Sequence, residues 1–372
     1  MGSQSVEIRN TAADATNVAA VVNITGATDT AADSVSVSLI ETVDTIAAAD
    51  DGNVDELDVS NYETVNLASA KEATTTGDIH NNLETLTAAS AKTVNVTGDS
   101  QLTIEGITGG AMTAFDASGL AAKLSATFSS TDKITATAAQ KDTTFAFGST
   151  LDNNDVVIGG AGSKDVVTAT VTGANAVTGA FNISGVETLT LTTSGNNTLD
   201  FAGISGLKTA SVSANTQTIK NFDLSTNLVA TGAAIIDLTA ANASGSADTL
   251  NLELKYDGAT SNTVKASNIE TLALVLNDTA ATVEASTLTL TDFTGTKVTA
   301  TESADSVVAR NLDLGTLNKS VLTVDTTGTK GTQDFSVANA TAGTTLSVSG
   351  AAVATVTGSG KGDTINVAET AG

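Results

Sequence analysis

Alternating acidic and amide side chains in the segment DDGNVDELD (50–58) have the types and spacing that could bind a metal ion. Asp51, Asn53 and Asp55 alternate like the first ligands of a calcium-binding loop, in which carboxylate and amide oxygens coordinate the ion. The glycine that usually follows the third ligand is missing, and so is the distal bidentate glutamate. Two interpretations of this loop therefore stay open: a calcium site, or an acidic turn that faces solvent.

Few residues of this chain could carry out catalysis. The sequence has a single histidine, His80, and no cysteine, which excludes two-histidine zinc sites, thiolate metal sites, disulfides and Cys-His dyads. No Gly-x-Ser-x-Gly segment supports a Ser-His-Asp triad through His80. Paired carboxylates for glycoside hydrolysis could be assembled from the many acids. Aromatic residues, which sugar clefts use as platforms, make up only 3% of the chain, so we expect no enzyme.

The charge balance is strongly acidic. There are 41 acidic and 16 basic residues, giving a net charge of -25 at pH 7. This field repels phosphate, so nucleic acid is not an expected partner. It also opposes compaction unless something neutralises it, and divalent cations are the obvious candidates. No apolar run is long enough to span a membrane, and Met1–Ser3 is typical of a cloning leader on a fragment.

Short β-strands are the elements that would position these residues. Val, Ile, Leu and Thr alternate in short runs, and Gly, Asn, Asp and Ser separate the runs, as in strands with one buried face joined by turns. Helical periodicity is scarce, and only ASGLAAKLSA (117–126) is compatible with one short helix. The sequence therefore predicts an all-β fold.

Two acidic series open these strands at regular spacing. Glu187 follows Asp165 by 22 residues, Glu270 follows Asp248 by the same 22, and the pairs are offset by 83 (187 − 165, 270 − 248, 248 − 165). Spacings near 20 predict the coils of a parallel β-solenoid or β-helix-like array. Each carboxylate would then stand near a corner, facing an ammonium or a cation rather than the core. Tandem β-sandwich modules would also give short alternating strands and are the alternative.

The repeats also predict a modular organisation. The duplicated pairs favour an N-terminal β-repeat module over residues 1–150, a first copy over 151–237, and a second copy with C-terminal strands over 238–372.

The segment ISGVETLTLTTSGNNTLDFAGISGLKTASVSA (183–214) resembles the repeat region of RsaA-type surface-layer proteins, and NIETLALVL (268–276) and AKTVNVTG (91–98) are weaker copies. Those proteins belong to Gram-negative bacteria and leave the cell by type I secretion. Their repeat regions form calcium-loaded β-solenoid modules that tile a lattice outside the outer membrane. The resemblance implies calcium (Ca²⁺), an extracellular location on the bacterial surface and self-association into a lattice or filament. Any anchor to a cell-surface polysaccharide would lie outside this segment.

Two segments also resemble the glycine-rich calcium repeats of secreted RTX proteins, G-G-x-G-x-D-x-U-x. GGAGSKDVV (159–167) has one extra residue before Asp165, and GSGKGDTIN (358–366) has Ser and Lys at two glycine positions. ASGSADTLN (243–251) is a more degenerate copy. The resemblance implies isolated ions, whose expected ligands and turns are Asp152, Asp155, Gly159, Gly160, Gly162 and Asp165, then Gly360, Gly362 and Asp363, and also Asp248.

Two functions from different classes follow. The chain is expected to be a structural surface-layer module that assembles through calcium, or else the calcium-stabilised repeat region of a secreted adhesin. Specific adhesion usually needs Tyr, Trp or Arg as anchor side chains. The sequence has no Trp and only two Tyr, which favours the structural module.

Overall fold

The computed structural model describes residues 3–10, 21–25, 32–41, 53–72, 80–129, 133–172, 179–256, 260–279, 285–291, 293–306, 309, 311–349 and 354–368. These residues contain no helix and form parallel sheets that wind into a β-solenoid of about 12 turns, here called coils. The predicted all-β solenoid is therefore confirmed. Because no helix occurs among these residues, none offers a long apolar helix for crossing a bilayer.

The chain divides into two compact units. The first comprises residues 1–170, 181–190 and 203–207, and the second comprises 171–180, 191–202 and 208–372. The expected division at residues 150 and 237 stays a prediction.

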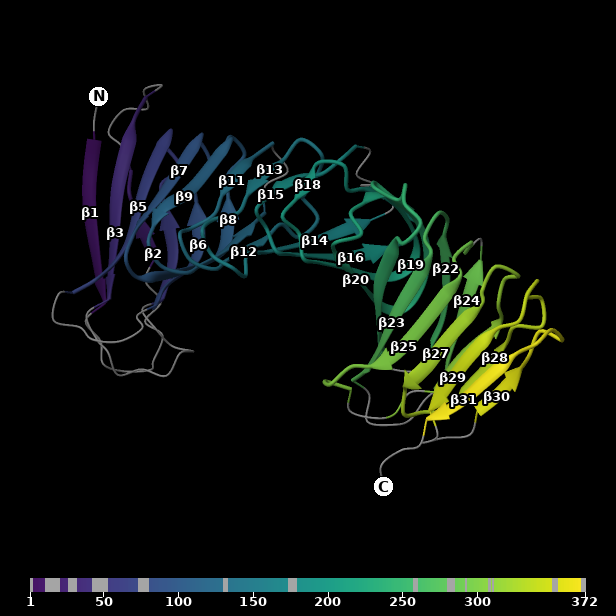
Figure 1. The fold of residues 1–372 in the computed structure, drawn as a ribbon. Coiled ribbons are helices and arrows are strands. Elements are labelled where there is room, and N and C mark those ends of the chain that lie inside the picture. The colour runs from purple at the N-terminus through teal and green to yellow at the C-terminus, as the bar shows by residue number, and fades with distance from the viewer. Residues whose placement is uncertain are drawn as a thin grey trace. The chain divides into compact units, whose positions relative to one another are not determined.

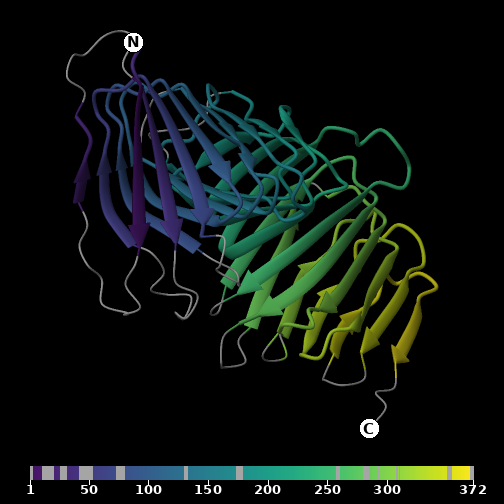
Figure 2. The same ribbon diagram turned by 90° about the vertical axis from the view of Figure 1, so that its left-hand side faces the viewer.

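In the first unit, nine parallel strands form one sheet (Figure 2). Neighbours in this sheet come from successive coils, and the chain crosses to a second parallel ladder between them. The strands of the sheet are β1 (Ser3–Asn10), β3 (Ser34–Glu41), β5 (Thr64–Lys71), β7 (Thr93–Gly98), β9 (Ala114–Leu120), β11 (Thr135–Thr137), β13 (Val156–Ile158), β15 (Asn182–Ser184) and β18 (Ile204–Ser205). Those of the second ladder are β2 (Val21–Asn23), β4 (Asn53–Asp58), β6 (His80–Thr87), β8 (Gln101–Thr108), β10 (Leu124–Phe128), β12 (Thr143–Ala146) and β14 (Val166–Thr172).

Alternating side chains give this unit its core. Every second residue of a strand points inward, and parallel register stacks these residues into columns. One column follows the sheet through Val65, Val94, Phe115, Ala136 and Val157, all fully buried. The polar residues between them face outward, which accounts for the alternation in the sequence.

Four phenylalanines thicken the same core. Phe128 is the centre of the group: its ring centroid lies 5.3 Å from that of Phe115, 5.7 Å from that of Phe145 and 4.8 Å from that of Phe147. Aromatic pairs at these separations add to the stabilisation from burial. They come from neighbouring coils and so help to fix the stacking.

The second unit begins with two long bent strands, β19 (Thr209–Phe222) and β20 (Asn227–Ala240). The first half of β20 pairs with β21 and its second half pairs with β22, so each long strand contributes to two ladders. Asn215 and Gly232 lie at the bends with φ of 85° and 74°. This left-handed conformation is one that Asn and Gly tolerate better than other residues.

Parallel ladders continue through the rest of this unit (Figure 1). Leu250, Leu272, Val298, Val324 and Leu346 form a fully buried column like that of the first unit. The remaining strands are β16 (Thr188–Ser194), β17 (Asn197–Asp200), β21 (Thr249–Tyr256), β22 (Thr260–Ala266), β23 (Thr271–Asp278), β24 (Ala285–Thr291), β25 (Lys297–Glu302), β26 (Asn311–Thr316), β27 (Thr323–Gly328), β28 (Gln333–Ser336), β29 (Thr345–Ser349), β30 (Ala354–Thr357) and β31 (Thr364–Ala368).

The segment that was compatible with a helix is instead strand, so that expectation is wrong. Residues 117–126 form the end of β9 and the start of β10. Leu120 and Leu124 have helical spacing, but they are buried at the end of one strand and the start of the next. A short turn between two strands reproduced the spacing of a helix.

Candidate metal sites at the coil corners

The predicted calcium loop at 50–58 is largely a strand. Asp51 lies outside the described residues, whereas Asn53 and Asp55 belong to β4. Val54 and Leu57 on this strand are buried. The loop expected for Asn53–Asp58 is therefore wrong, because apolar burial extends the backbone and spaces these residues along a strand.

Asp155, which directly precedes β13, is buried with 2% of its surface exposed. Its Oδ1 accepts a hydrogen bond of 3.0 Å from the backbone N–H of Ile134, which lies 21 residues earlier on the preceding coil. Its Oδ2 accepts one of 2.8 Å from the backbone N–H of Asp152. Both oxygens of this carboxylate therefore hold backbone groups, one across the coils and one within its own turn.

Asp165, which directly precedes β14, repeats this arrangement. It is 1% exposed, and its Oδ1 accepts a 2.7 Å bond from the N–H of Thr143 on the preceding coil. Its Oδ2 accepts a 2.8 Å bond from the N–H of Gly160 in the glycine-rich turn. The N–H of Asp165 in turn donates at 2.9 Å to Oε2 of Glu187, one coil later.

The glycines of this turn are required by close contact between coils. A Cβ on Gly160 would lie 1.8 Å from the carbonyl oxygen of Ala139, and one on Gly159 would lie 1.9 Å from that of Gly185. A Cβ on Gly162 would lie 2.8 Å from the backbone nitrogen of Asp142. Stacking of the backbone is therefore sufficient to explain all three glycines.

Asp152 serves the turn locally. Its Oδ1 accepts a 2.6 Å bond from the N–H of Asn154, and its Oδ2 accepts a 3.2 Å bond from the Asn154 amide. This is a turn-stabilising contact of a kind common for Asp.

The second glycine-rich turn also ends in a carboxylate that joins two coils. Oδ1 of Asp363 accepts bonds from the N–H of Thr344 at 2.9 Å and from its hydroxyl at 2.8 Å. Oδ2 accepts a 2.7 Å bond from the N–H of Ser359. Gly360 has a left-handed φ of 70°, whereas a Cβ on Gly362 would meet nothing within 4 Å.

The degenerate segment at 243–251 keeps part of the pattern. Oδ2 of Asp248 accepts a 3.0 Å bond from the N–H of Gly245, within the turn. The N–H of Asp248 donates at 2.9 Å to Oε2 of Glu270, as that of Asp165 does to Glu187. The two pairs that are offset by 83 residues in the sequence therefore make the same contact.

These contacts define a group that we call the corner carboxylates. Each directly precedes a strand and accepts a hydrogen bond from a backbone N–H near the start of the corresponding strand one coil earlier. They are Glu63, Asp155, Asp165, Glu187, Glu270 and Asp363. The sequence carried the signal, since acids at strand starts recurred at coil spacing. We expected them to face an ammonium or a cation, whereas the contacts observed here are to backbone N–H groups.

Burial sets the protonation preference of the two innermost members. It raises the pKa of the Asp155 carboxyl, and the nearby Asp152 raises it further. Burial also raises the pKa of Asp165, with Glu187 and Asp142 acting in the same direction. The backbone N–H bonds oppose both shifts. In contrast, hydrogen bonds from Ser359 and Thr344 lower the pKa of Asp363 to about 2.

Asp155 and Asp165 as arranged do not fit a calcium ion. Both oxygens of each already accept backbone hydrogen bonds, and burial favours the neutral carboxyl, whereas calcium binds the ionised form. Within the described ranges, no three His, Cys, Asp or Glu side chains gather as a metal-binding group. Calcium ligation by the remaining expected residues stays a prediction.

Further polar residues are buried inside the coils and also serve the fold. Gln217 donates from Nε2 to the hydroxyl of Thr193 at 2.9 Å, and that hydroxyl donates to the carbonyl of Ser213 at 2.8 Å. In the first unit, the Asn81 amide donates to the hydroxyl of Ser69 at 2.9 Å. Buried polar groups need such partners, because leaving them unpaired is unfavourable.

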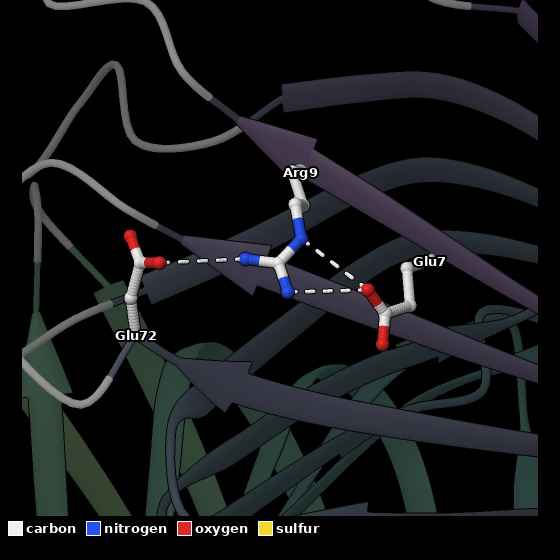
Figure 3. Close-up of polar contacts among 3 residues, drawn as sticks. All are labelled: Glu7, Arg9 and Glu72. Carbon is white, nitrogen blue, oxygen red and sulfur yellow. Dashed lines mark hydrogen bonds and ion pairs between the residues drawn. The ribbon is translucent and has the colours of Figure 1, made fainter.

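A charged cluster lies at the first edge of the solenoid (Figure 3). The guanidinium of Arg9 on β1 approaches Glu7 at 3.1 Å and Glu72, just after β5, at 3.6 Å. The three side chains are 45–58% exposed, so each pair stabilises the fold by less than ~1 kcal/mol. His80 begins β6, where it is paired in register with Gln101. That the chain is not an enzyme stays a prediction.

Comparisons with known proteins add no identity. No protein-family model, no curated protein and no solved structure matches the chain.

Proposed function

We propose that this chain is a structural module of a bacterial surface layer, which associates with copies of itself when calcium is present. The observation that carries the proposal is the use of its polar side chains. The corner carboxylates and the buried polar residues hold neighbouring coils together, as expected of a module that builds a scaffold.

Charge explains why association would depend on ions. Copies with a net charge of -25 repel each other at moderate salt. Asp116, Asp237 and Asp334 are exposed acids on the strands, and such acids are free of the burial that disfavours ionisation at Asp155 and Asp165. Calcium prefers oxygen ligands in flexible geometry, so it is suited to bridging exposed carboxylates, whereas magnesium keeps its water and demands octahedral geometry.

The cell-surface location rests on the resemblance of residues 183–214 to surface-layer repeats. Calcium is scarce in the cytosol and abundant outside, so the module would stay dispersed for export and associate at the surface. An ion that binds only the associated form favours that form by mass action.

Light scattering and electron microscopy of the purified chain test the proposal. The protein is placed in chelator and then given millimolar calcium, with magnesium and with sodium chloride of equal ionic strength as controls. We expect sheets or filaments with calcium and much less association in the controls. A chain that stays monomeric with calcium contradicts the proposal. If that monomer binds whole cells, the adhesin becomes the better interpretation.

A further inference from the structure

We propose that the corner carboxylates are metal-independent latches, each of which holds a backbone N–H of the preceding coil and thereby sets the stacking of the solenoid. The inference rests on the proposed function in one respect, which is that it narrows where calcium could act. It assigns these acids to the fold and leaves any response to calcium to other carboxylates.

The glutamate latches share one geometry. The N–H groups of Asp33, Asp165 and Asp248 each donate at 2.9 Å to the glutamate one coil later. The carbonyl of the same aspartate accepts two N–H groups, from that glutamate and from the threonine after it, at 3.0–3.2 Å. The carboxylate thus completes a corner whose carbonyl is already joined to the next coil. The accepting residues are Glu63, Glu187 and Glu270.

The aspartate latches have a shorter arm and a second task. Asp155, Asp165 and Asp363 each use Oδ1 for an N–H of the preceding coil. Each uses Oδ2 for an N–H of the turn that leads into its own strand. One side chain therefore fixes the shape of a turn and joins it to the neighbouring coil.

Electrostatics explains why a cation is not needed here. Each N–H directs the positive end of its dipole at the carboxylate, where a metal would otherwise supply the positive charge. Calcium requires six to eight oxygens at about 2.3–2.6 Å, whereas the described partners of Asp165 are backbone donors. The chain itself neutralises these acids, so the stacking survives chelation.

The prediction is directional, because a latch on one coil protects an amide on the coil before it. Loss of the Asp165 side chain should expose the amide protons of Thr143 and Gly160 to exchange. The Glu187 N–H bonds to the carbonyl of Asp165, which the substitution keeps, so this amide should stay protected.

Hydrogen exchange measured in chelator and in millimolar calcium tests this on Asp165→Ala and Asp165→Asn. The control is Asp116→Asn, because the exposed Asp116 accepts a bond only two residues away, from the N–H of Ser118. We expect the amides of Thr143 and Gly160 to exchange about 10- to 100-fold faster in the alanine variant, with or without calcium. The asparagine variant should be intermediate, because its single carbonyl oxygen can accept only part of what the carboxylate does.

A second pair keeps the proposal falsifiable if Asp165→Ala does not fold. Glu187→Gln retains an acceptor oxygen without charge, whereas Glu187→Ala removes it. We expect the amide of Asp165 to stay protected in the glutamine variant and to lose protection in the alanine variant. The pair Glu270→Gln and Glu270→Ala should repeat this result at Asp248.

Two outcomes would overturn the latches. In one, the wild-type amides of Thr143 and Asp165 exchange rapidly in chelator and become protected only with calcium. In the other, glutamine at 187 loses as much protection as alanine, which would show that charge, and not an acceptor, is what matters. Failure of the proposed function is read separately, as absence of calcium-dependent light scattering by the wild type with its amides still protected.

Discussion

The two glycine-rich turns have similar sequences and similar hydrogen bonds, yet their carboxylates titrate in opposite directions. Asp165 and Asp363 each join their own turn to the preceding coil. The pKa of Asp165 is raised, chiefly by burial, whereas that of Asp363 is lowered to about 2 by the side-chain hydrogen bonds of Ser359 and Thr344. The comparison teaches that exposure, and not the bonding pattern, decides which effect dominates.

The glycines of the two turns differ as well. Gly160 is in contact with the next coil, so that a Cβ would overlap the carbonyl of Ala139, whereas Gly362 has open space. A Gly-x-Gly pattern therefore has different physical causes in the two turns. Resemblance to a calcium repeat does not distinguish these causes.

The largest expected effect separates these glycines. Gly160→Ala should destabilise the fold by about 3 kcal/mol or more, because the added Cβ lies 1.8 Å from a backbone oxygen and the coils must shift. Gly362→Ala should be neutral or stabilising by up to about 1 kcal/mol, since it restricts the unfolded chain without a clash. Thermal unfolding of the two variants checks this, and equal losses would break the comparison.

The next effect concerns the carboxylates themselves. Asp165→Ala should cost about 2–5 kcal/mol, because it removes the acceptor from two backbone N–H groups in a buried site. Asp363→Ala should cost clearly less, because water can reach this partly exposed position and replace the lost acceptor. Melting temperatures at neutral pH measure both, and a larger loss for Asp363→Ala would contradict the role given to burial.

The smallest expected effect is a difference in pH dependence. The raised pKa of Asp165 means that its contribution is fully present below the ordinary carboxyl pKa and is lost as pH rises through the folded value. The lowered pKa of Asp363 means the reverse: its contribution is present above the ordinary value and is lost as pH falls toward 2.

Melting curves from pH 2 to 7 test these signs against Asp165→Asn and Asp363→Asn. The advantage of wild type over Asp165→Asn should shrink from pH 4 to pH 7, with Glu187 and Asp142 as the charges that face Asp165. Its advantage over Asp363→Asn should shrink from pH 4 to pH 2. Parallel profiles for the two variants would show that the environments are alike.

The coil architecture could be predicted from the sequence because strand alternation and acidic spacing both report local geometry. The partner of the carboxylates could not, since a backbone N–H one coil away leaves no mark in residue types. Asp55 shows the opposite failure, because its ligand-like spacing belongs to a strand with Val54 and Leu57 buried. Coil contacts that require Gly159 and Gly160 were likewise hidden behind a pattern shared with calcium turns.

A crystal structure of the chain grown with millimolar calcium would test the latches most directly. The account predicts that Asp155 and Asp165 keep their bonds to the N–H groups of Ile134 and Thr143, near 3.0 and 2.7 Å, with no ion in coordination distance of their oxygens. An ion bound to either carboxylate, with those N–H groups displaced, would contradict it.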